Sequence, residues 1–594
     1  MQEHLEKGYI REVKGIDEKE PHWFLPHFPI VKGDQEEIKV RIVFDAAAKV
    51  RGRCLNDFLH TGPKLQTDLI DILLRMRKHR YVVLCDVKEM FLQIEVHPED
   101  RRYLRFLWKG KENDTQKVME FNRVVFGLSA SPFLANLVSR VNADKFNERY
   151  PRAVEVIKRS TYMDDCVDSV DTEFEAVELS SQLKEIWHHA SMEAHKWASN
   201  SEEVMKSIPI EARMKGVTFE EEGKNSAKTL GLKWDVAKDV YHFEFTRTGS
   251  ERLTKRILLS HIARIFDPLG FLSCVTITGK ILLQNLWIHS VNWDDALPED
   301  LHRKLQEWLV ELKSLNLLNF SRCLGGVPNS DITCHVFCDA SGEAYGTVIY
   351  LRVESKDGIT VNLVMAKARV TPTKSVSIPR LELVAACLAV KVNRRVMNAL
   401  GINVNQVTYW TDSMDVLYWI RARSKTLKTF VANRVGYIQE QSIIDQWQHV
   451  GTTSNPADLL TRGSTVDRLR VNRSWWSGPE FLSRKREHWP KQPSVFDKPR
   501  NDERRKGFIL TVITTPVESE ILGQPRLWIT QGDTEWAKTV SNKVEELKRD
   551  PDQPLIEALQ FRHKAGMALI REDQRRFFQK EIDVLGKSRC CPIN

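Results

Sequence analysis

A chain of 594 residues is too long for a single hydrophobic core, so we expect several domains. Its 42% hydrophobic and 28% charged residues are typical of a globular protein and argue against disorder. The formal net charge of +8 suits a polyanionic partner without specifying one. The ten cysteines form no disulfide framework, and Cys334 and Cys338 around His335 are better explained as buried strand thiols than as a zinc site.

The N-terminal half of the chain predicts a strand, a second buried strand and a hairpin. Residues 38–45 alternate in polarity, which places Lys39 and Arg41 on one face of a strand. Residues 80–85 predict a buried strand that ends at Asp86. Residues 160–170 predict a tight hairpin with Met-Asp-Asp at its turn.

Ser131 and Pro132 predict the start of a helix, with Ser131 as N-cap and Pro132 at the first helical position. We expect one apolar face on this helix, formed by Phe133, Leu134, Leu137, Val138 and Val141. Residues 250–320 predict a mostly helical stretch with a break at Asp267-Pro268-Leu269-Gly270.

From about residue 330 the pattern changes to strands that end at acidic residues. The predicted elements are a strand over 332–338 before Asp339, a strand over 345–351, a helix over 380–399 after Pro379, a strand over 406–411 before Asp412, and a short helix that is capped by Asn455-Pro456 and carries Asp458. Beyond residue 470 the chain is rich in Pro, Arg and Trp. From about 535 it is charged and predicted to be helical.

The first acidic set combines Asp86 at a strand end with Asp164 and Asp165 at a hairpin tip. Three carboxylates placed this way suit two Mg²⁺ ions, which can activate a hydroxyl and stabilise a leaving pyrophosphate. The alternative is ordinary turn chemistry, which would explain two adjacent aspartates on their own.

Six motifs in order decide between these alternatives, and they are Lys39–Asp45, Leu55-Asn56-Asp57 through Gly62–Gln66, Asp86–Phe91, Phe126–Pro132, Tyr162–Asp165 and Thr229–Trp234. Together they resemble the reverse transcriptases of long-terminal-repeat retrotransposons, most closely the BEL/Pao group, from about residue 5 to about 480. The resemblance implies that Asp86, Asp164 and Asp165 bind the metal ions.

The same resemblance implies a nucleotide site. Arg41 matches a residue that contacts the incoming triphosphate, a role that suits a permanently charged bidentate donor, and Lys39 lies on the same strand face. Phe91 matches the aromatic residue that blocks a 2′-hydroxyl, although a core Phe at a strand end is the alternative. Phe126 and Gly127 match the loop that supports the nucleotide. Lys196 loosely matches a lysine that protonates pyrophosphate.

The second acidic set is Asp339, Glu382, Asp412 and Asp458, and its flanking motifs resemble a ribonuclease H domain. Four carboxylates at one sheet edge would bind two further Mg²⁺ ions, with water as the nucleophile. Taken alone, Glu382 would be explained as an acid favoured in a helix's first turn. His449 is a candidate for the mobile histidine of such domains, with a surface histidine as the alternative.

The expected fold class is α/β. It combines an α+β right-hand polymerase with palm, fingers and thumb and a ribonuclease H-like mixed-sheet α/β domain. The expected domains are fingers and palm (1–245), a helical thumb or connection (246–325), a ribonuclease H-like domain (326–470) and a linker leading toward an integrase that the chain does not include (471–594).

The expected activities are RNA-directed DNA polymerase and hybrid-specific ribonuclease. The expected cofactor is Mg²⁺, two ions per site, with Mn²⁺ as the alternative. The expected partners are an RNA template, a DNA primer, an RNA–DNA hybrid and deoxynucleoside triphosphates, and we expect no membrane partner. The N-terminus is polar and lacks a signal peptide, so we expect a cytoplasmic location or a retroelement particle.

Two other functions stay open: a silent remnant that only binds nucleic acid, and a Pao-type peptidase. The seven intact acids argue against advanced decay of the sites. No Asp-Ser-Gly or Asp-Thr-Gly sequence is present to supply aspartic-protease chemistry.

Overall fold

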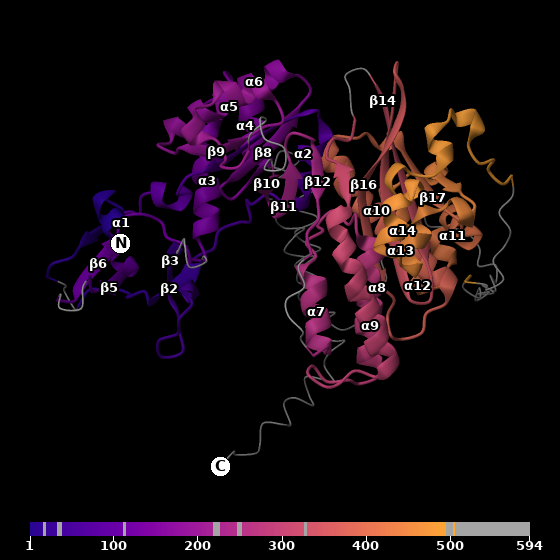
Figure 1. Ribbon diagram of the computed structural model, residues 1–594, viewed down its shortest axis with the longest axis horizontal. Coiled ribbons are helices and arrows are strands. Elements are labelled where there is room, and N and C mark those ends of the chain that lie inside the picture. Colours follow the sequence, from indigo (N-terminus) through magenta and orange to yellow (C-terminus); the bar gives the residue numbers. More distant parts are fainter. Residues whose placement is uncertain are drawn as a thin grey trace, which may run out of the picture. The chain divides into compact units, whose positions relative to one another are not determined.

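The computed structural model describes residues 1–15, 19–32, 39–110, 115–217, 226–245, 252–325, 330–494 and 503–504. Residues 1–507 form one compact unit (Figure 1). The helical segment predicted beyond residue 535 lies outside the described residues. Among the helices that the structure describes, none is long and apolar enough to cross a membrane.

The N-terminal part contains two small antiparallel sheets around an aromatic core. The first sheet has the order β1-β6-β5, and the second is the hairpin β2–β3, whose β3 confirms the predicted strand. Phe106 packs between Phe44 and Phe121, with ring centroids 4.9 and 5.1 Å away. The elements are α1 (Gln2–Glu6), β1 (Ile10–Glu12), β2 (His27–Lys32), β3 (Lys39–Phe44), β5 (Arg105–Trp108) and β6 (Lys117–Phe121).

A four-stranded antiparallel sheet of order β7-β8-β4-β9 follows. Its strand β4 is buried on both faces, because Val82 and Leu84 join one hydrophobic core while Val83 and Cys85 join another. Its elements are α2 (Leu69–Lys78), β4 (Tyr81–Val87), α3 (Ser131–Asp144), α4 (Pro151–Arg159), β7 (Thr161–Tyr162), β8 (Asp165–Val170), α5 (Glu173–His189), β9 (Ala194–Ala198) and α6 (Glu202–Ser207).

Helix α3 begins where the sequence predicts, but its N-cap was predicted wrongly. Its predicted apolar face packs against the core only in part, through Leu134 and Val138. Ala130 is the N-cap, and the Ser131 hydroxyl donates instead to the carbonyl of Val125 at 2.7 Å. The buried positions are small or polar, and they are Ser131, Ala135, Asn136, Ser139, Asn142 and Ala143. Leu137 and Val141 are exposed. Small side chains allow close packing of the helix, and their hydroxyls and amides bond nearby carbonyls, as Asn142 does with Ile186.

The next segment combines a short sheet with three helices that pack in sequence, α7 on α8 and α8 on α9 (Figure 1). The sheet has the order β10-β11-β12-β13. The elements are β10 (Ser226–Thr229), β11 (Leu232–Asp235), β12 (Val240–His242), α7 (Lys255–Arg264), α8 (Ser273–Ile288), α9 (Glu299–Glu311) and β13 (Asn319–Ser321). The helical character of this stretch is confirmed.

The predicted helix break at Asp267–Gly270 is confirmed, and the structure shows its mechanical role. The Asp267 carboxylate accepts hydrogen bonds from the backbone N–H groups of Phe271 and Leu272, at 2.9 and 2.7 Å. The Leu269 carbonyl accepts one from Ala366 of β16 (Gly358–Val370) at 2.9 Å. A Cβ on Gly270 would lie only 1.9 Å from the Ala366 carbonyl oxygen. The turn therefore docks α8 onto the edge of the C-terminal sheet.

The C-terminal sheet has the order β16-β15-β14-β17-β18. Strands β14, β15 and β16 are antiparallel, whereas β17 and β18 run parallel to β14, and α10 packs on β14 and β15. The remaining elements are β14 (Asp331–Ala340), β15 (Ala344–Ser355), α10 (Ile378–Leu400), β17 (Val407–Thr411), α11 (Met414–Arg421), α12 (Thr429–Gln441), β18 (Trp447–His449), α13 (Leu459–Arg462), α14 (Val466–Val471) and α15 (Arg473–Ser477).

Two buried arginines join the end of α2 to the rest of the unit. Arg77 donates to the carbonyls of Arg322, Val364 and Leu363 at 2.8–2.9 Å. Arg322 is fully buried, pairs with Asp239 at 2.6 Å and donates to carbonyls at the C-terminal end of α2. Each guanidinium satisfies backbone acceptors that would otherwise be buried without a partner.

Candidate functional site

The three acids of the first set lie together at one end of the four-stranded sheet. Asp86 on β4 is directly opposite Asp165 on β8, and the backbone N–H of Val87 donates to the Asp164 carbonyl at 2.8 Å. The hairpin β7–β8 holds Met163 at φ +57°, a left-handed conformation that is costly for a side chain of this kind. The predicted hairpin is thereby confirmed, and its tip presents two adjacent carboxylates to Asp86.

Strand β9 supplies two basic side chains to Asp86. His195 is the strand partner of Asp86, and its Nδ1 lies 2.9 Å from the Asp86 carbonyl oxygen and 3.3 Å from its Oδ1. The Lys196 ammonium lies 2.7 Å from Asp86 Oδ2, with the Lys196 backbone at φ +50°. Three strained residues, Met163, Lys196 and Glu89, therefore surround the acids, as is common where a fold fixes functional groups.

Burial and mutual repulsion weaken the acidity of this cluster. The pKa of Asp165 is raised to about 6, mainly because the carboxyl group is buried and further because of the charges of Asp164 and Asp86. The pKa of Asp164 is also raised, chiefly by burial. Such a group of carboxylates gains free energy when a cation compensates its charge.

The loop that carries Gly127 is fixed against the N-terminal part of the chain. Gly127 has φ +102°, and a Cβ there would lie 2.4 Å from the Phe44 carbonyl oxygen, so no other residue fits. The Asn56 amide donates to the Gly127 carbonyl at 3.1 Å and accepts from the Ser129 N–H at 2.8 Å. The sequence motif around Asn56 thus holds the Phe126–Ser129 loop in place.

The predicted nucleotide residues lie on three separate elements. Phe91 follows β4 in the 3₁₀ helix η2 (Met90–Gln93) and is buried, while Phe126 is 59% exposed and packs its ring 4.4 Å from that of Phe91. Arg41 lies exposed on β3, opposite Ile30, and Lys39 begins the same strand. The rings of Phe91 and Phe126 contact each other, and Arg41 lies on a separate strand.

The four acids of the second set converge at the end of the C-terminal sheet where the interior strands β14 and β17 terminate. Asp339 lies on β14, Asp412 follows the parallel neighbour β17, and Glu382 lies in the first turns of α10. Asp458 ends the 3₁₀ helix η10 (Pro456–Asp458), whose N-cap is Asn455, as predicted.

Neutral side chains orient these carboxylates. Thr461 donates to Asp339 Oδ2 at 2.9 Å, Ser413 donates to Glu382, and the Asn455 amide lies 3.4 Å from Asp412 Oδ1. The Asn455 amide also donates to the Cys338 carbonyl at 3.1 Å, which links η10 to β14.

The second cluster shows the same electrostatic pattern as the first. Burial, reinforced by the charges of Asp412 and Asp339, raises the pKa of Glu382 to about 7. Burial and the Asp412 charge raise the pKa of Asp339 to about 6. These four acids are therefore within electrostatic reach of one another, although they come from four distant segments of the chain.

Within the described ranges, no three His, Cys, Asp or Glu side chains are already arranged as a metal cage. Asp86 is turned toward Lys196, and Asp458 pairs with Arg462 at 2.8 Å. His449 on β18 is the strand partner of Thr411, the residue before Asp412. Cys334, His335 and Cys338 are all buried in β14, which agrees with their assignment as core residues.

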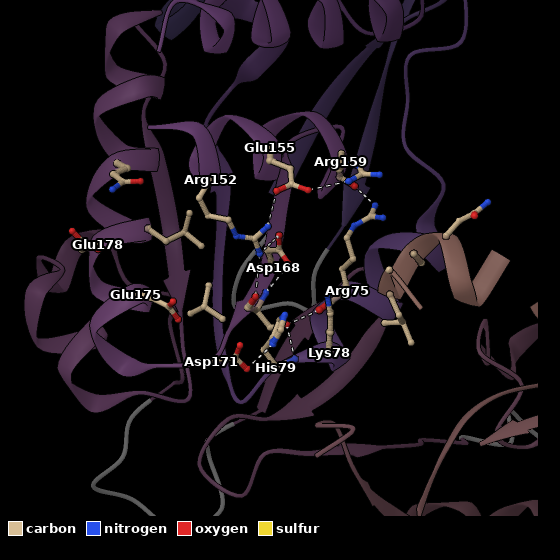
Figure 2. A pocket seen from close by; sticks show the side chains of 18 residues that line it. Arg75, Lys78, His79, Arg152, Glu155, Arg159, Asp168, Asp171, Glu175 and Glu178 are labelled. Carbon is tan, nitrogen blue, oxygen red and sulfur yellow. Dashed lines mark hydrogen bonds and ion pairs between the residues drawn. The ribbon is translucent and has the colours of Figure 1, made fainter. Parts of the chain in front are cut away.

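A cavity of about 580 Å³ lies beside α2, lined by α4, α5, β8 and the end of α10 (Figure 2). Several of its charged side chains pair with one another. Arg152 contacts Asp168 at 3.1 Å, and His79 contacts Asp171 at 2.7 Å. Its lining includes none of the seven predicted acids. We therefore assign this cavity no catalytic role.

Two family models match the chain in the order that the two acidic sets occupy. One is described as reverse transcriptase (RNA-dependent DNA polymerase) and matches residues 38–200. The other is described as a Pao retrotransposon-like RNaseH-like domain and matches residues 254–413. The chain therefore carries a region similar to reverse transcriptases, followed by a region similar to the Pao retrotransposon ribonuclease H-like domain. Among curated proteins, none matches it significantly.

A solved structure of a foamy viral protease-reverse transcriptase shares the fold. A complex with double-stranded DNA superposes with a TM-score of 0.50 at 15% identity, covering 75% of this chain and 67% of that one. A complex with RNA/DNA hybrid gives a TM-score of 0.48 at 15% identity, covering 78% of this chain and 54% of that one. The first likeness agrees with a polymerase fold followed by a ribonuclease H-like domain.

The sequence pattern did not reveal the side chains that orient the acids. His195, Ser413 and Thr461 are common residue types, and each meets its acid only across strands or between separate elements. Asn56 was part of a quoted motif, but its bond to the Gly127 loop depends on the fold. Only Asn455 could be recognised from the sequence, because an Asn-Pro pair predicts a helix N-cap.

Proposed function

We propose that this chain copies RNA into DNA at the Asp86, Asp164 and Asp165 site and cleaves the RNA strand of the hybrid at the Asp339, Glu382, Asp412 and Asp458 site. The observation that carries the proposal is the presence of two separate carboxylate clusters. Each contains acids whose pKa is raised by burial and by neighbouring acids. The first cluster lies within the reverse transcriptase match, and Asp339, Glu382 and Asp412 of the second lie within the RNaseH-like match, which ends before Asp458.

Both clusters suit divalent cations by the chemistry of their donors. Carboxylate oxygens are the ligands that Mg²⁺ prefers, and Mg²⁺ sites commonly use few protein carboxylates and are completed by substrate phosphates. Two ions in each site, Mg²⁺ or alternatively Mn²⁺, would supply charge stabilisation for an in-line displacement. The protein's own part is to hold five of the acids at or next to strand ends and Glu382 and Asp458 on helices, and to orient Asp86, Glu382 and Asp339 through His195, Ser413 and Thr461.

The proposed nucleotide site would combine basic side chains that bind the triphosphate with an aromatic ring that contacts the sugar. Lys39 and Arg41 would bind the triphosphate, for which the exposed Arg41 is available. Phe91, supported by Phe126 at 4.4 Å, would leave no room for a 2′-hydroxyl and so would select deoxynucleotides. The Phe126–Ser129 loop, which is fixed by Asn56, would contact and support the nucleotide.

The proposed partners are an RNA template, a DNA primer, an RNA–DNA hybrid and deoxynucleoside triphosphates. The foamy viral enzyme named above is described in complex with double-stranded DNA, which supports a nucleic-acid partner here. We also propose the domain limits 1–245, 246–325, 326–470 and 471–594, and a cytoplasmic location.

Primer extension on an RNA template with Mg²⁺ and deoxynucleotides tests the polymerase. We expect extension by the unchanged protein and its abolition in Asp164→Asn. A matched control is Asp171→Asn, which alters a palm carboxylate paired with His79 and should leave extension unchanged. Lack of extension by well-folded protein would reject the proposal in favour of a remnant that only binds nucleic acid.

Hybrid cleavage tests the second site. We expect Asp412→Asn to stop cleavage of the RNA strand while sparing extension, because Asp412 lies in the other cluster. Loss of both activities would argue against two separate sites. The match over residues 254–413 is to an RNaseH-like domain, which leaves the peptidase alternative without a supporting observation.

A further inference from the structure

We infer that Glu89, held by Lys7 and Tyr9 of the N-terminal segment, is a positioning residue that fixes Phe91 and thereby sets sugar selectivity. The inference rests on the proposed role of Phe91 as the residue that excludes a 2′-hydroxyl. It extends that proposal from the Phe91 ring to the hydrogen bonds that hold the turn containing this ring.

Glu89 has an unusual backbone for its residue type. It connects β4 to η2 with φ +51° and ψ +36°, and its carbonyl accepts the N–H of Leu92 at 2.8 Å. The left-handed conformation is unfavourable for a residue with a Cβ, so interactions of the Glu89 side chain must help to maintain it. Phe91 lies two residues further on, inside the turn that this conformation starts.

The side chain of Glu89 is bound by two residues of the first nine. The Lys7 ammonium lies 3.1 Å from both carboxylate oxygens, and the Tyr9 hydroxyl donates to Oε2 at 2.9 Å. The same hydroxyl accepts a hydrogen bond from the Gln93 amide at 3.0 Å. Tyr9 therefore bonds to the residue that precedes η2 and to the last residue of η2, on either side of Phe91.

Tyr9 is itself firmly placed. Its side chain is 7% exposed in the N-terminal core, and its carbonyl accepts the N–H of Asn122 at 2.9 Å, next to the pairing of β1 with β6. Phe91 belongs instead to the core of the palm. The Tyr9 hydroxyl consequently ties a turn of the palm to a rigid part of the N-terminal sheet, and the position of the Phe91 ring depends on that tie.

Single-nucleotide insertion opposite a template G tests the inference with dCTP and CTP as competing substrates. Tyr9→Phe keeps the ring and removes the shared hydroxyl. We expect the ratio of kcat/KM for dCTP over CTP to fall about three- to ten-fold, as the loss of one or two hydrogen bonds predicts. The value for dCTP alone should stay within about two-fold.

Three variants sharpen the test. Tyr150→Phe removes another Tyr–Glu bond of the palm, the 2.7 Å contact to Glu185, and should leave the ratio unchanged. Glu89→Gly adopts the left-handed conformation freely but lacks the side chain, so it should lower the ratio as Tyr9→Phe does. Glu89→Gln, which can still accept from Tyr9, should retain most of the ratio.

A second measurement separates this inference from the proposed polymerase. Equilibrium binding of dCTP and CTP to the full chain on a dideoxy-terminated primer requires no chemistry. If the protein fails to extend primers, the polymerase proposal fails, while a binding preference for dCTP that Tyr9→Phe reduces would still support the inference. An unchanged ratio in Tyr9→Phe, an equal loss for both nucleotides, or no preference in the unchanged protein would overturn it.

Discussion

Gly127 is a residue of the Phe126–Ser129 loop at which even one added methyl group should strongly destabilise the protein. A Cβ there meets the Phe44 carbonyl oxygen at 2.4 Å, and φ +102° is unfavourable for any L side chain. We expect Gly127→Ala to lower the free energy of unfolding by about 2–4 kcal/mol in urea denaturation. Gly52→Ala is the control, because φ there is +81° but no atom lies within 4 Å of the added Cβ. A loss in Gly127→Ala no greater than in Gly52→Ala would contradict the predicted clash.

The raised pKa of Glu382 predicts a pH dependence with a definite sign. Its folded pKa of about 7 lies above the ordinary value of 4.5, so deprotonation costs the folded state free energy. Without divalent cations, stability should therefore increase as pH falls from about 7 to about 4.5, by on the order of 2–3 kcal/mol.

Thermal unfolding with and without Mg²⁺ checks this sign. Mg²⁺ binds the charged form, so its stabilisation should be larger at pH 8 than at pH 6. Hybrid cleavage at limiting Mg²⁺ should decline as pH falls through about 7 and recover when Mg²⁺ is raised. Glu382→Gln should reduce the pH dependence of stability, and equal Mg²⁺ stabilisation at both pH values would contradict the assignment.

Among individual residues, the strand-end positions of several acids could be predicted from the sequence, but the side chains that hydrogen-bond to the acids could not. Asp86 and Asp339 lie just before the ends of apolar strands and Asp412 directly follows one, and that local pattern is visible in the sequence. Thr461 reaches Asp339 across 122 positions of sequence, a proximity that only the folded sheet creates.

Individual elements show where local pattern fails. Strands β3, β4 and β17 follow from apolar runs, whereas β16 had no predicted counterpart. In α3 the apolar stripe contacts the core through Leu134 and Val138 but is exposed at Leu137 and Val141, and the fully buried positions hold small side chains and amides instead. Periodicity predicts that a helix forms, but the side it buries is decided by tertiary packing.

The end of α2 depends on Arg322, and a substitution there should be severe. Removing the guanidinium takes away the cationic partner of Asp239, which keeps the hydrogen bond from Trp234 Nε1, and it removes the side-chain donor from the carbonyls of Met76 and His79. We expect Arg322→Met to lower the free energy of unfolding by about 3–5 kcal/mol. Arg256→Met is a suitable control, since its pair with Asp294 is exposed on both sides and should contribute less than about 1 kcal/mol. A similar decrease in the free energy of unfolding in the two variants would refute the role of Arg322 in stabilising the end of α2.

In the whole molecule, the polymerase palm and the ribonuclease H-like sheet share one hydrophobic core. Leu73 of α2 and Val336 of β14 belong to the same buried cluster, whereas Phe106 belongs to a separate cluster in the N-terminal part. Arg395 of α10 also pairs with Asp71 of α2. Sequence motifs placed the two activities in order but gave no sign of this shared core, because the residues that form it are separated by hundreds of positions.

Leu73→Ala should therefore destabilise the C-terminal sheet although Leu73 belongs to the polymerase part. A buried Leu→Ala change costs about 2–5 kcal/mol, and cooperative unfolding would spread that loss to β14 and β15. Hydrogen exchange followed by mass spectrometry should show faster exchange in the peptides of both strands. Phe106→Ala should accelerate exchange in β5 and β6 while leaving β14 and β15 protected. Unchanged protection of β14 and β15 in Leu73→Ala would mean that the two parts unfold independently, and the chain would then consist of two separable enzymes rather than one cooperative unit.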